Sequence, residues 1–283
     1  MTVLGVSLGN LHPHFHLDAT LEAERLGFES VWLPEHLVFP IDMRGSPLPG
    51  HDHPPVPPTT PVFDAFAMLS FLAGKTERIR LGTHVYLLGL RHPFVSARAV
   101  QTLDIVSGGR AEVGIGAGWL EAECRAAGIS FSDRGRRLDE AIAVCKRLWT
   151  EDVVEHRGEF FAFEPVAFEP KPVQRPWPPL LVGGESKAAL RRAAYLADGW
   201  LGLGHTPQSV RPLVERLHEL RREAETTDTQ FQITVSGEVS SPEDLEVWAD
   251  AGVHRVLVSP WKRSPEAVES LRRLAEKAMQ SSV

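Results

Sequence analysis

The chain has 283 residues, of which 43% are hydrophobic and 24% are charged, and its formal net charge is −7. These values predict a soluble globular protein with a single domain over residues 1–283. The dispersed basic residues argue against a nucleic-acid partner, and no apolar run is long enough to span a membrane. The N-terminus enters a predicted strand without a basic leader, so we expect no signal peptide. We interpret Cys124 and Cys145 as reduced thiols. Both features predict a cytoplasmic protein.

Short apolar strands alternate with helices along the chain. In the first half we expect strands at 3–8, 30–33, 79–85 and 111–115, and helices at 17–26, 61–74, 93–106, from 121, and at 133–149. A segment rich in Phe, Pro and Glu, at about 153–179, reads as an inserted loop or hairpin. Strands at 179–182, 199–203, 232–236 and 255–259 then alternate with helices at 186–197, 208–226, 242–251 and 265–279.

Eight such units predict an α/β fold of the (β/α)8 TIM-barrel type, with an insertion between strands 4 and 5. An open doubly wound sheet is the alternative. In a TIM barrel the active site lies at the carboxyl ends of the strands. Chemically active residues are therefore expected directly after the predicted strands.

A glycine-rich corner follows the fourth predicted strand, with Gly114, Gly116 and Gly118 at alternate positions. Such a corner can expose backbone N–H groups to a planar or anionic ligand, and it can equally be a tight turn without a ligand. The spacing differs from the G-x-G-x-x-G fingerprint of dinucleotide-binding folds.

Two other strand ends carry candidate chemistry. Glu35 and His36 follow the second strand, where His36 could act as an acid or base near neutral pH or could only bond loop backbone. Gly183, Gly184 and Glu185 lead from the fifth barrel strand into a helix. Free N–H groups at that helix start could bind a phosphate, and a plain turn is the alternative.

Histidines recur in two loops and raise the question of a zinc site. His51 and His53 lie in the proline-rich segment 38–61, and His12 lies in the loop after the first strand. No carboxylate or histidine partner is evident to orient them, so we expect no metal. We expect His12, His51, His53 and Trp119 to shape a substrate pocket instead.

Several segments, taken in order, resemble the luciferase-like flavin and deazaflavin enzymes, especially their F420-dependent oxidoreductase branch. The resemblance runs nearly from end to end. The segments that carry it are residues 27–36, 80–85, 103–110, 114–123, 134–140, 182–184 and 197–200.

The resemblance implies a TIM barrel with a reduced flavin-type ring lying across the strand ends. It also implies a non-prolyl cis peptide in a bulge of the third strand, behind the ring, which maps onto His84 and Val85. By the same mapping, Ala117 and Gly118 contact the ring or the side chain of the cofactor. Gly183 and Gly184 contact its phosphate, with Glu185 beside them. Glu35 and His36 take ring-contacting and proton-transferring roles.

This chain departs from the family at one position. Related sugar-phosphate dehydrogenases carry a catalytic Glu directly after the glycine corner, where this chain has Trp119. Glu123 lies too far along the following helix to be a simple replacement. The chain also lacks an obvious basic cluster for a sugar phosphate, so we expect an apolar or neutral substrate.

We therefore expect an oxidoreductase that transfers a hydride between coenzyme F420 and a small organic substrate, with His36 and Glu35 as its catalytic residues. A monooxygenase that uses reduced FMN is the alternative. A non-catalytic flavin- or deazaflavin-binding protein and a zinc hydrolase are further alternatives. The resemblance also implies a homodimer.

Overall fold

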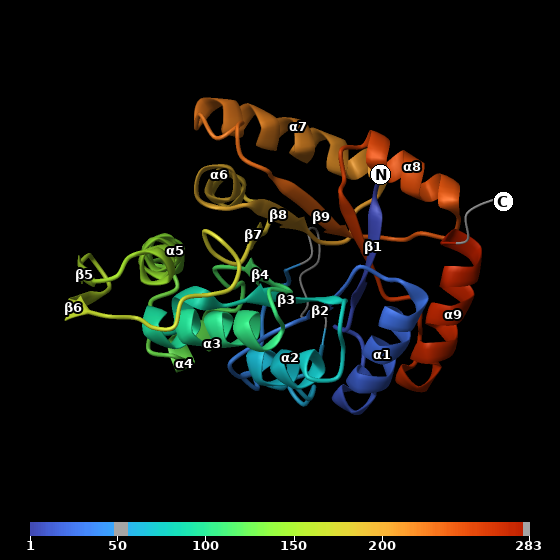
Figure 1. Cartoon of the computed structure of the whole chain (residues 1–283), viewed down its shortest axis with the longest axis horizontal. Helices are drawn as coiled ribbons and strands as arrows, with labels where there is room; N and C mark the ends of the chain where they lie inside the picture. Colours follow the sequence, from blue (N-terminus) through green and yellow to red (C-terminus); the bar gives the residue numbers. More distant parts are fainter. Residues whose placement is uncertain (48–55, 280–283) are drawn as a thin grey trace.

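The computed structural model describes residues 1–47 and 56–279, and its strands close into a parallel barrel with helices around it (Figure 1). Around the barrel the strands follow the order β1-β10-β9-β8-β7-β4-β3-β2. This closure confirms the predicted TIM barrel and excludes the open sheet. The barrel strands are β1 (Val3–Ser7), β2 (Ser30–Leu33), β3 (Arg80–Tyr86), β4 (Ala111–Ile115), β7 (Leu180–Gly183), β8 (Gly199–Gly202), β9 (Gln232–Ser236) and β10 (Arg255–Val258).

The helices pack their apolar sides on the outer wall of this barrel. In α9, for example, Leu271, Leu274 and Ala278 are buried at helical spacing while the opposite side is charged. The helices are α1 (His16–Leu26), α2 (Ala65–Ala73), α3 (Pro93–Val106), α4 (Glu121–Ala126), α5 (Arg134–Thr150), α6 (Lys187–Leu196), α7 (Pro207–Glu223), α8 (Pro242–Asp250) and α9 (Ala267–Ala278), with short 3-10 turns η1 (Pro13–Phe15), η2 (Leu88–Leu90) and η3 (Ser264–Glu266).

Helix α2 begins later than the predicted range 61–74. The carboxylate of Asp64 accepts a hydrogen bond of 2.8 Å from the N–H of Ala67, and Asp64 itself has non-helical backbone angles (φ −57°, ψ 122°). An aspartate in this position caps the first turn of a helix, because that turn has N–H groups without intrahelical acceptors. The cap at Asp64 therefore sets the start of α2 at Ala65.

The insertion forms an antiparallel hairpin of β5 (Val154–Arg157) and β6 (Ala162–Val166), which projects from the barrel beside α5 (Figure 1). Glu140 of α5 holds this hairpin. Its carboxylate accepts hydrogen bonds of 2.9 Å from His156 Nε2 and from the N–H groups of Phe160 and Phe161. The hairpin is thus fixed to the outside of the barrel wall.

A small apolar layer fills the inside of the barrel. Trp32, Leu181, Leu201 and Leu257 form this layer, and the half-buried side chain of Val85 packs against it. The indole of Trp32 lies against Gly82, where a Cβ would come within 2.4 Å of the ring. Glycine at position 82 therefore provides the space that the tryptophan occupies.

A buried ionic cluster lies below this layer, at the amino ends of the strands. The guanidinium of Arg255, whose side chain is 1% exposed, donates hydrogen bonds of 2.7 Å to both Glu29 and Glu112. Arg80 forms a further ion pair with Glu112. Burial alone raises the pKa of Glu112, but the neighbouring guanidinium groups of Arg255 and Arg80 outweigh burial and hold this pKa below its ordinary value.

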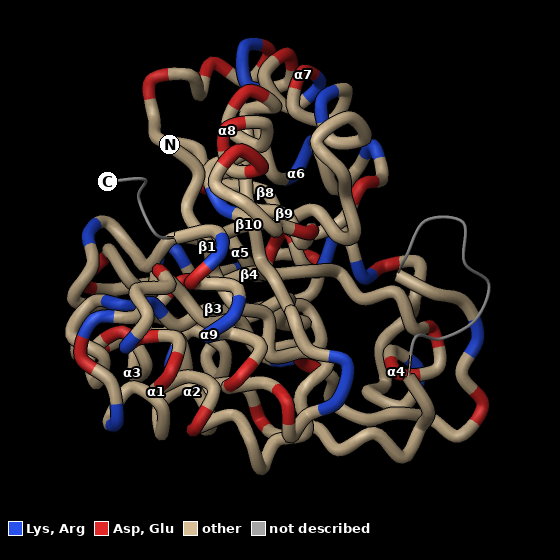
Figure 2. The backbone as a smooth tube through the Cα atoms, turned by 90° about the vertical axis from the view of Figure 1, so that its right-hand side faces the viewer, with Lys and Arg blue, Asp and Glu red and all other residues tan. Residues whose placement is uncertain are grey.

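Charges elsewhere are mixed in sign. Figure 2 shows Lys and Arg interleaved with Asp and Glu along the helices, most clearly on α7.

None of the helices in residues 1–47 and 56–279 combines the length and the apolar character that a membrane-spanning helix requires.

Replacing Arg255 by Ala leaves the buried carboxylate of Glu112 without its main partner. We expect Arg255→Ala to lower the free energy of unfolding by about 3–5 kcal/mol, because removing one partner from a buried ionic cluster is strongly destabilising, even though Arg80 remains beside Glu112. Urea unfolding followed by circular dichroism measures this loss. The matched control Arg216→Ala, which removes an exposed guanidinium from α7, should leave the midpoint nearly unchanged.

The same cluster predicts a pH dependence of stability. The pKa of Glu112 is lower in the folded chain than in the unfolded chain, so its stabilisation is complete above the unfolded value and is lost as the pH falls through the folded value. An Arg255→Ala chain that kept the wild-type midpoint would contradict this account of the cluster.

Candidate functional site

The glycine corner after β4 is shaped by close packing against β3. A Cβ on Gly114 would come within 2.0 Å of the carbonyl oxygen of Thr83, and a Cβ on Gly116 within 2.6 Å of Val85 Cγ2. The N–H of Gly116 donates to the carbonyl of Tyr86 at 3.0 Å. At these two positions, therefore, the glycines allow β3 and β4 to approach, and the Gly116 N–H is engaged in the sheet.

Strand β3 carries a bulge opposite this corner. Its pairing with β4 shifts register between Thr83 and Tyr86, and the peptide bond between His84 and Val85 is cis. This is the bond that the resemblance implies. The side chain of Val85 fits between two glycines, since a Cβ on Gly183 would also come within 2.8 Å of Val85 Cγ1. The bulge thus places a half-buried valine at the mouth of the barrel.

His84, the other residue of the bulge, is half-buried at the same level. Loss of solvation lowers the pKa of His84 to about 4. The imidazole is therefore neutral at pH 7, and it puts no positive charge beside Val85.

Glu35 lies at the end of β2 but does not face the mouth as a free carboxylate. Its side chain is 1% exposed. Oε1 accepts a hydrogen bond of 2.7 Å from Arg91 Nη2, and Oε2 accepts one of 2.9 Å from the N–H of Leu87. The prediction of Glu35 as a catalytic residue is therefore not favoured by this geometry. The carboxylate instead ties the end of β2 to the segment that follows the bulge of β3.

His36 forms the most distinctive contact of the mouth. Its Nδ1 lies 2.8 Å from Oε2 of Glu123, whose side chain is 1% exposed. The other oxygen, Oε1, accepts hydrogen bonds from the N–H groups of Leu37 at 2.6 Å and Val38 at 3.3 Å. His36 Nε2 has no hydrogen-bond partner among the described residues. The ring of Trp119 meets the imidazole edge-on, with centroids 5.9 Å apart.

Glu123, expected to lie too far along its helix to be a simple replacement for the catalytic Glu, nevertheless reaches the mouth through this contact with His36. Helix α4 begins immediately after the glycine corner, and Glu123 lies in its first turn. That turn faces the loop that follows β2. Glu123 and Arg91 are the two residues that sequence reasoning missed. The only local signal for Glu123 was a carboxylate in the first turn after Trp119.

The Gly183 and Gly184 turn leads from β7 into α6. Gly184 has φ = 110°, a conformation that favours glycine. Ser186 caps α6 by accepting from the N–H of Ala189. The carboxylate of Glu185 lies 3.0 Å from Nε2 of His205, which follows β8. The exposed start of α6 offers free N–H groups to an anion, with the carboxylate of Glu185 beside it.

The other predicted site residues are less closely connected. Ala117 and Gly118 are half-buried beside Trp119. His12 is exposed, and its backbone N–H donates to Ser264 Oγ in the segment after β10. His51 and His53 lie outside the described residues. Among the residues that are described, no group of three or more His, Cys, Asp or Glu is arranged to hold a metal ion.

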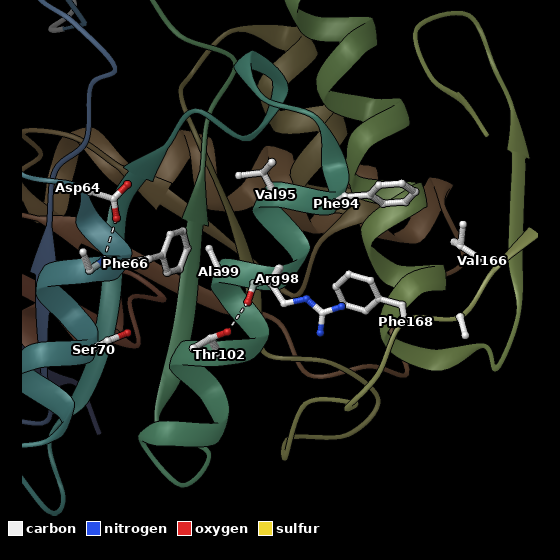
Figure 3. Close-up of a pocket in the computed structure, with 12 residues that line it drawn as sticks. Asp64, Phe66, Ser70, Phe94, Val95, Arg98, Ala99, Thr102, Val166 and Phe168 are labelled. Atoms are coloured by element: carbon white, nitrogen blue, oxygen red, sulfur yellow. Dashed lines mark hydrogen bonds between the residues drawn. The ribbon is translucent and has the colours of Figure 1, made fainter. Parts of the chain in front are cut away.

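An open groove of about 770 Å³ lies away from the mouth, between α2, α3 and the hairpin (Figure 3). Phe66, Phe94, Val95 and Phe168 contribute to its apolar lining. Asp64 and Arg98 are the charged residues of this lining, and the guanidinium of Arg98 lies 3.9 Å from the centroid of the Phe168 ring. The groove shares no residue with the mouth.

Comparison with protein families gives one match that covers almost the whole chain. The sequence model described as luciferase-like monooxygenase matches residues 4–281. An uncharacterized protein of Mycobacterium tuberculosis, Rv0953c, is 33% identical over 261 residues, which are 90% of each chain. An FMNH(2)-dependent dimethylsulfone monooxygenase of Pseudomonas putida is 30% identical over 200 residues, which are 70% of this chain and 53% of that protein.

Solved structures share the fold at lower sequence identity. The monooxygenase RslO1 from Streptomyces bottropensis superposes with a TM-score of 0.78 at 22% identity, with 99% of each chain covered. An F420-dependent secondary alcohol dehydrogenase, solved with an F420-acetone adduct, superposes with a TM-score of 0.75 at 18% identity, covering 97% of this chain and 98% of that chain.

The packing of Val85 against Gly116 can be tested by a compensating pair of substitutions. We expect Gly116→Ala to lower the free energy of unfolding by about 1–3 kcal/mol, because the new Cβ overpacks against Val85. Adding Val85→Ala removes the opposing methyl groups and should recover part of this loss. Thermal unfolding of both single variants and the double variant measures the coupling, and strictly additive losses would contradict the proposed contact.

Proposed function

The chain belongs to the luciferase-like monooxygenase family, and from that premise we propose that it is an oxidoreductase that transfers a hydride between coenzyme F420 and a small, neutral organic substrate. The observation that carries the proposal is His36, which Glu123 holds at the mouth and whose Nε2 has no hydrogen-bond partner within residues 1–47 and 56–279. Because a histidine near neutral pH can accept or donate a proton, this atom is placed to serve a substrate.

The residues of the mouth fit a planar tricyclic ring. Val85 offers an apolar side chain, and the glycines at 116 and 183 keep the space around it free of other side chains. His84, the residue before Val85 in the chain, is neutral at pH 7 and adds no positive charge there. A flat, apolar and uncharged wall suits the face of a ring. When bound there, the deazaflavin would accept a hydride from the substrate carbon or deliver one to it.

The start of α6 fits the phosphate of the same cofactor. Free N–H groups and the helix dipole favour an anion at this position. The carboxylate of Glu185 would be unfavourable beside a phosphate unless His205, whose Nε2 lies 3.0 Å from it, is protonated. In this proposal Gly183, Gly184 and the first turn of α6 hold the phosphate.

Four side chains would complete the site. His36 Nε2 moves the proton to or from the substrate. The ring of Phe39, 4.5 Å from the imidazole centroid, and Trp119 on another side exclude water from it. His12 lies at the rim. With aromatic and apolar neighbours around the proton-transfer group, a neutral substrate fits better than a phosphorylated one.

A reduced-FMN monooxygenase is the alternative function, and the Pseudomonas putida relative favours it. FMN also combines a tricyclic ring with a phosphate, so it would use the same wall and the same helix start. A non-catalytic flavin- or deazaflavin-binding protein is the second alternative, and it predicts binding without turnover. A cytoplasmic location remains a prediction.

We also propose that the chain forms a homodimer through α2 and α3. Helix α2 contains no charged residue in Ala65–Ala73, yet its Phe71 is 48% exposed, and Val95 of α3 is 58% exposed. A helix that is apolar on all sides is normally buried. The groove also carries one acidic and one basic residue, Asp64 and Arg98 (Figure 3), so a second copy related by a two-fold axis can place unlike charges together.

The cofactor proposal predicts a difference in affinity between F420 and FMN. Titration of the purified protein, followed by quenching of cofactor fluorescence, should give tight binding of F420 and weak binding of FMN. A preference for FMN would support the monooxygenase, and binding of neither would remove the cofactor proposal.

The proton-transfer proposal predicts a loss of rate without a loss of binding. His36→Asn should slow the hydride-transfer step about 10²–10⁴-fold while F420 affinity largely survives. Stopped-flow absorbance of the cofactor measures the step with a substrate found by screening alcohols and carbonyl compounds. The control His218→Asn changes an exposed histidine of α7 and should keep the wild-type rate. An unchanged rate in His36→Asn would contradict the role of His36.

The dimer proposal predicts that a charge on the α2 surface prevents association. Light scattering after size-exclusion chromatography should give twice the chain mass for the wild type and the single-chain mass for Phe71→Glu. The control Val247→Glu places the same charge at a 42% exposed valine of α8 and should remain dimeric. A monomeric wild type would reject the proposal.

A further inference from the structure

We infer that Glu123 is the positioning residue for His36, fixing which ring nitrogen carries the hydrogen and anchoring the loop that bears the histidine. The inference rests on the proposed function, because it assigns the origin of the free nitrogen that the function uses. The contact that supports it joins His36, which follows β2, to Glu123, which follows β4. These two residues lie 87 positions apart in the chain.

The contacts of Glu123 decide whether Nδ1 of His36 carries a hydrogen. A carboxylate that is ionised can only accept hydrogen bonds. Oε1 of Glu123 already accepts from two backbone N–H groups, those of Leu37 and Val38. With Oε2 as a further acceptor, the 2.8 Å contact with His36 is made by a hydrogen that Nδ1 donates.

The same contact also determines the state of Nε2. In a neutral imidazole only one ring nitrogen carries hydrogen, so an Nδ1 that donates leaves Nε2 as a bare acceptor. The imidazole side chain is 16% exposed, whereas the Glu123 side chain is 1% exposed. The histidine is thus held from its buried side, and the accessible nitrogen is the basic one. After Nε2 takes a proton from the substrate, the buried carboxylate stabilises the positive ring.

Glu123 also anchors the loop that bears the histidine. Leu37 and Val38 are the first residues after His36 in the long connection to α2, and both of their N–H groups end on Glu123. The same carboxylate therefore sets the backbone on which the imidazole is carried. The hydrogen bonds from Leu37 and Val38 and the hydrogen bond with Nδ1 all end on one carboxylate. Together they fix both the position of the imidazole ring and its orientation.

This arrangement allows a substitution that separates the two tasks of Glu123. In Glu123→Gln the amide oxygen can still accept from Leu37 and Val38, while the amide NH2 replaces the oxygen that faces His36. An NH2 group is a donor. It therefore favours the opposite tautomer, in which Nδ1 accepts and Nε2 carries the hydrogen.

The experiment combines histidine tautomers with kinetics. Nitrogen-15 NMR of the full-length protein labelled in histidine, assigned by His36→Asn, should show His36 with hydrogen on Nδ1 in the wild type and on Nε2 in Glu123→Gln. The hydride-transfer rate of Glu123→Gln should fall about 10²–10⁴-fold, with F420 affinity nearly unchanged. Glu123→Asp, which keeps the charge, should recover part of the rate.

The control is Glu121→Gln, which changes a carboxylate of the same helix that is 66% exposed and faces Arg125. It should alter neither the tautomer nor the rate. A wild-type His36 with hydrogen on Nε2, or a Glu123→Gln variant with the wild-type rate, would overturn the inference. If His36→Asn itself retains the wild-type rate, the proposed function fails, whereas a slow His36→Asn beside a fast Glu123→Gln removes only the role of Glu123.

Discussion

The mouth of the barrel depends on two buried carboxylates that connect neighbouring strand ends. Glu35 at the end of β2 binds Arg91 and the N–H of Leu87, beyond β3. Glu123 beyond β4 binds His36 and the backbone that follows it. Glu35 and His36 are adjacent after β2, and each of them bonds to a different loop. Because both carboxylates are almost fully buried, each is costly to leave unpaired, and this cost keeps the three loops together.

The second constraint is steric. The bulge at His84 and Val85 is accommodated because Gly114, Gly116 and Gly183 leave room for it. The alternating glycines of the corner after β4 therefore follow from the shape of β3. Below them, the apolar layer around Trp32 and the ionic cluster around Arg255 fill the barrel. A filled interior leaves the mouth as the place where a ligand can meet side chains of several strands at once.

The fold could be predicted from the sequence because short apolar strands and helices alternate in a regular order. The start of α2 was predicted too early, because the cap that sets it is a single hydrogen bond between Asp64 and Ala67. At the site, the position after the second strand indicated His36, and the family resemblance indicated the bulge of β3. It could not reveal the partners: Arg91 lies 56 positions from Glu35, and Glu123 lies 87 positions from His36. Contacts between separate βα loops leave no periodic pattern, so only the folded chain brings these residues together.

The most direct measurement of the central claim is a crystal structure of the protein with bound F420. The account predicts a ring that lies against Val85 at the barrel mouth, with His36 Nε2 facing the reactive edge and Glu123 still bonded to Nδ1. The phosphate should lie at the start of α6. A cofactor bound elsewhere, for example in the groove between α2 and α3, or a His36 that has left Glu123, would contradict the account.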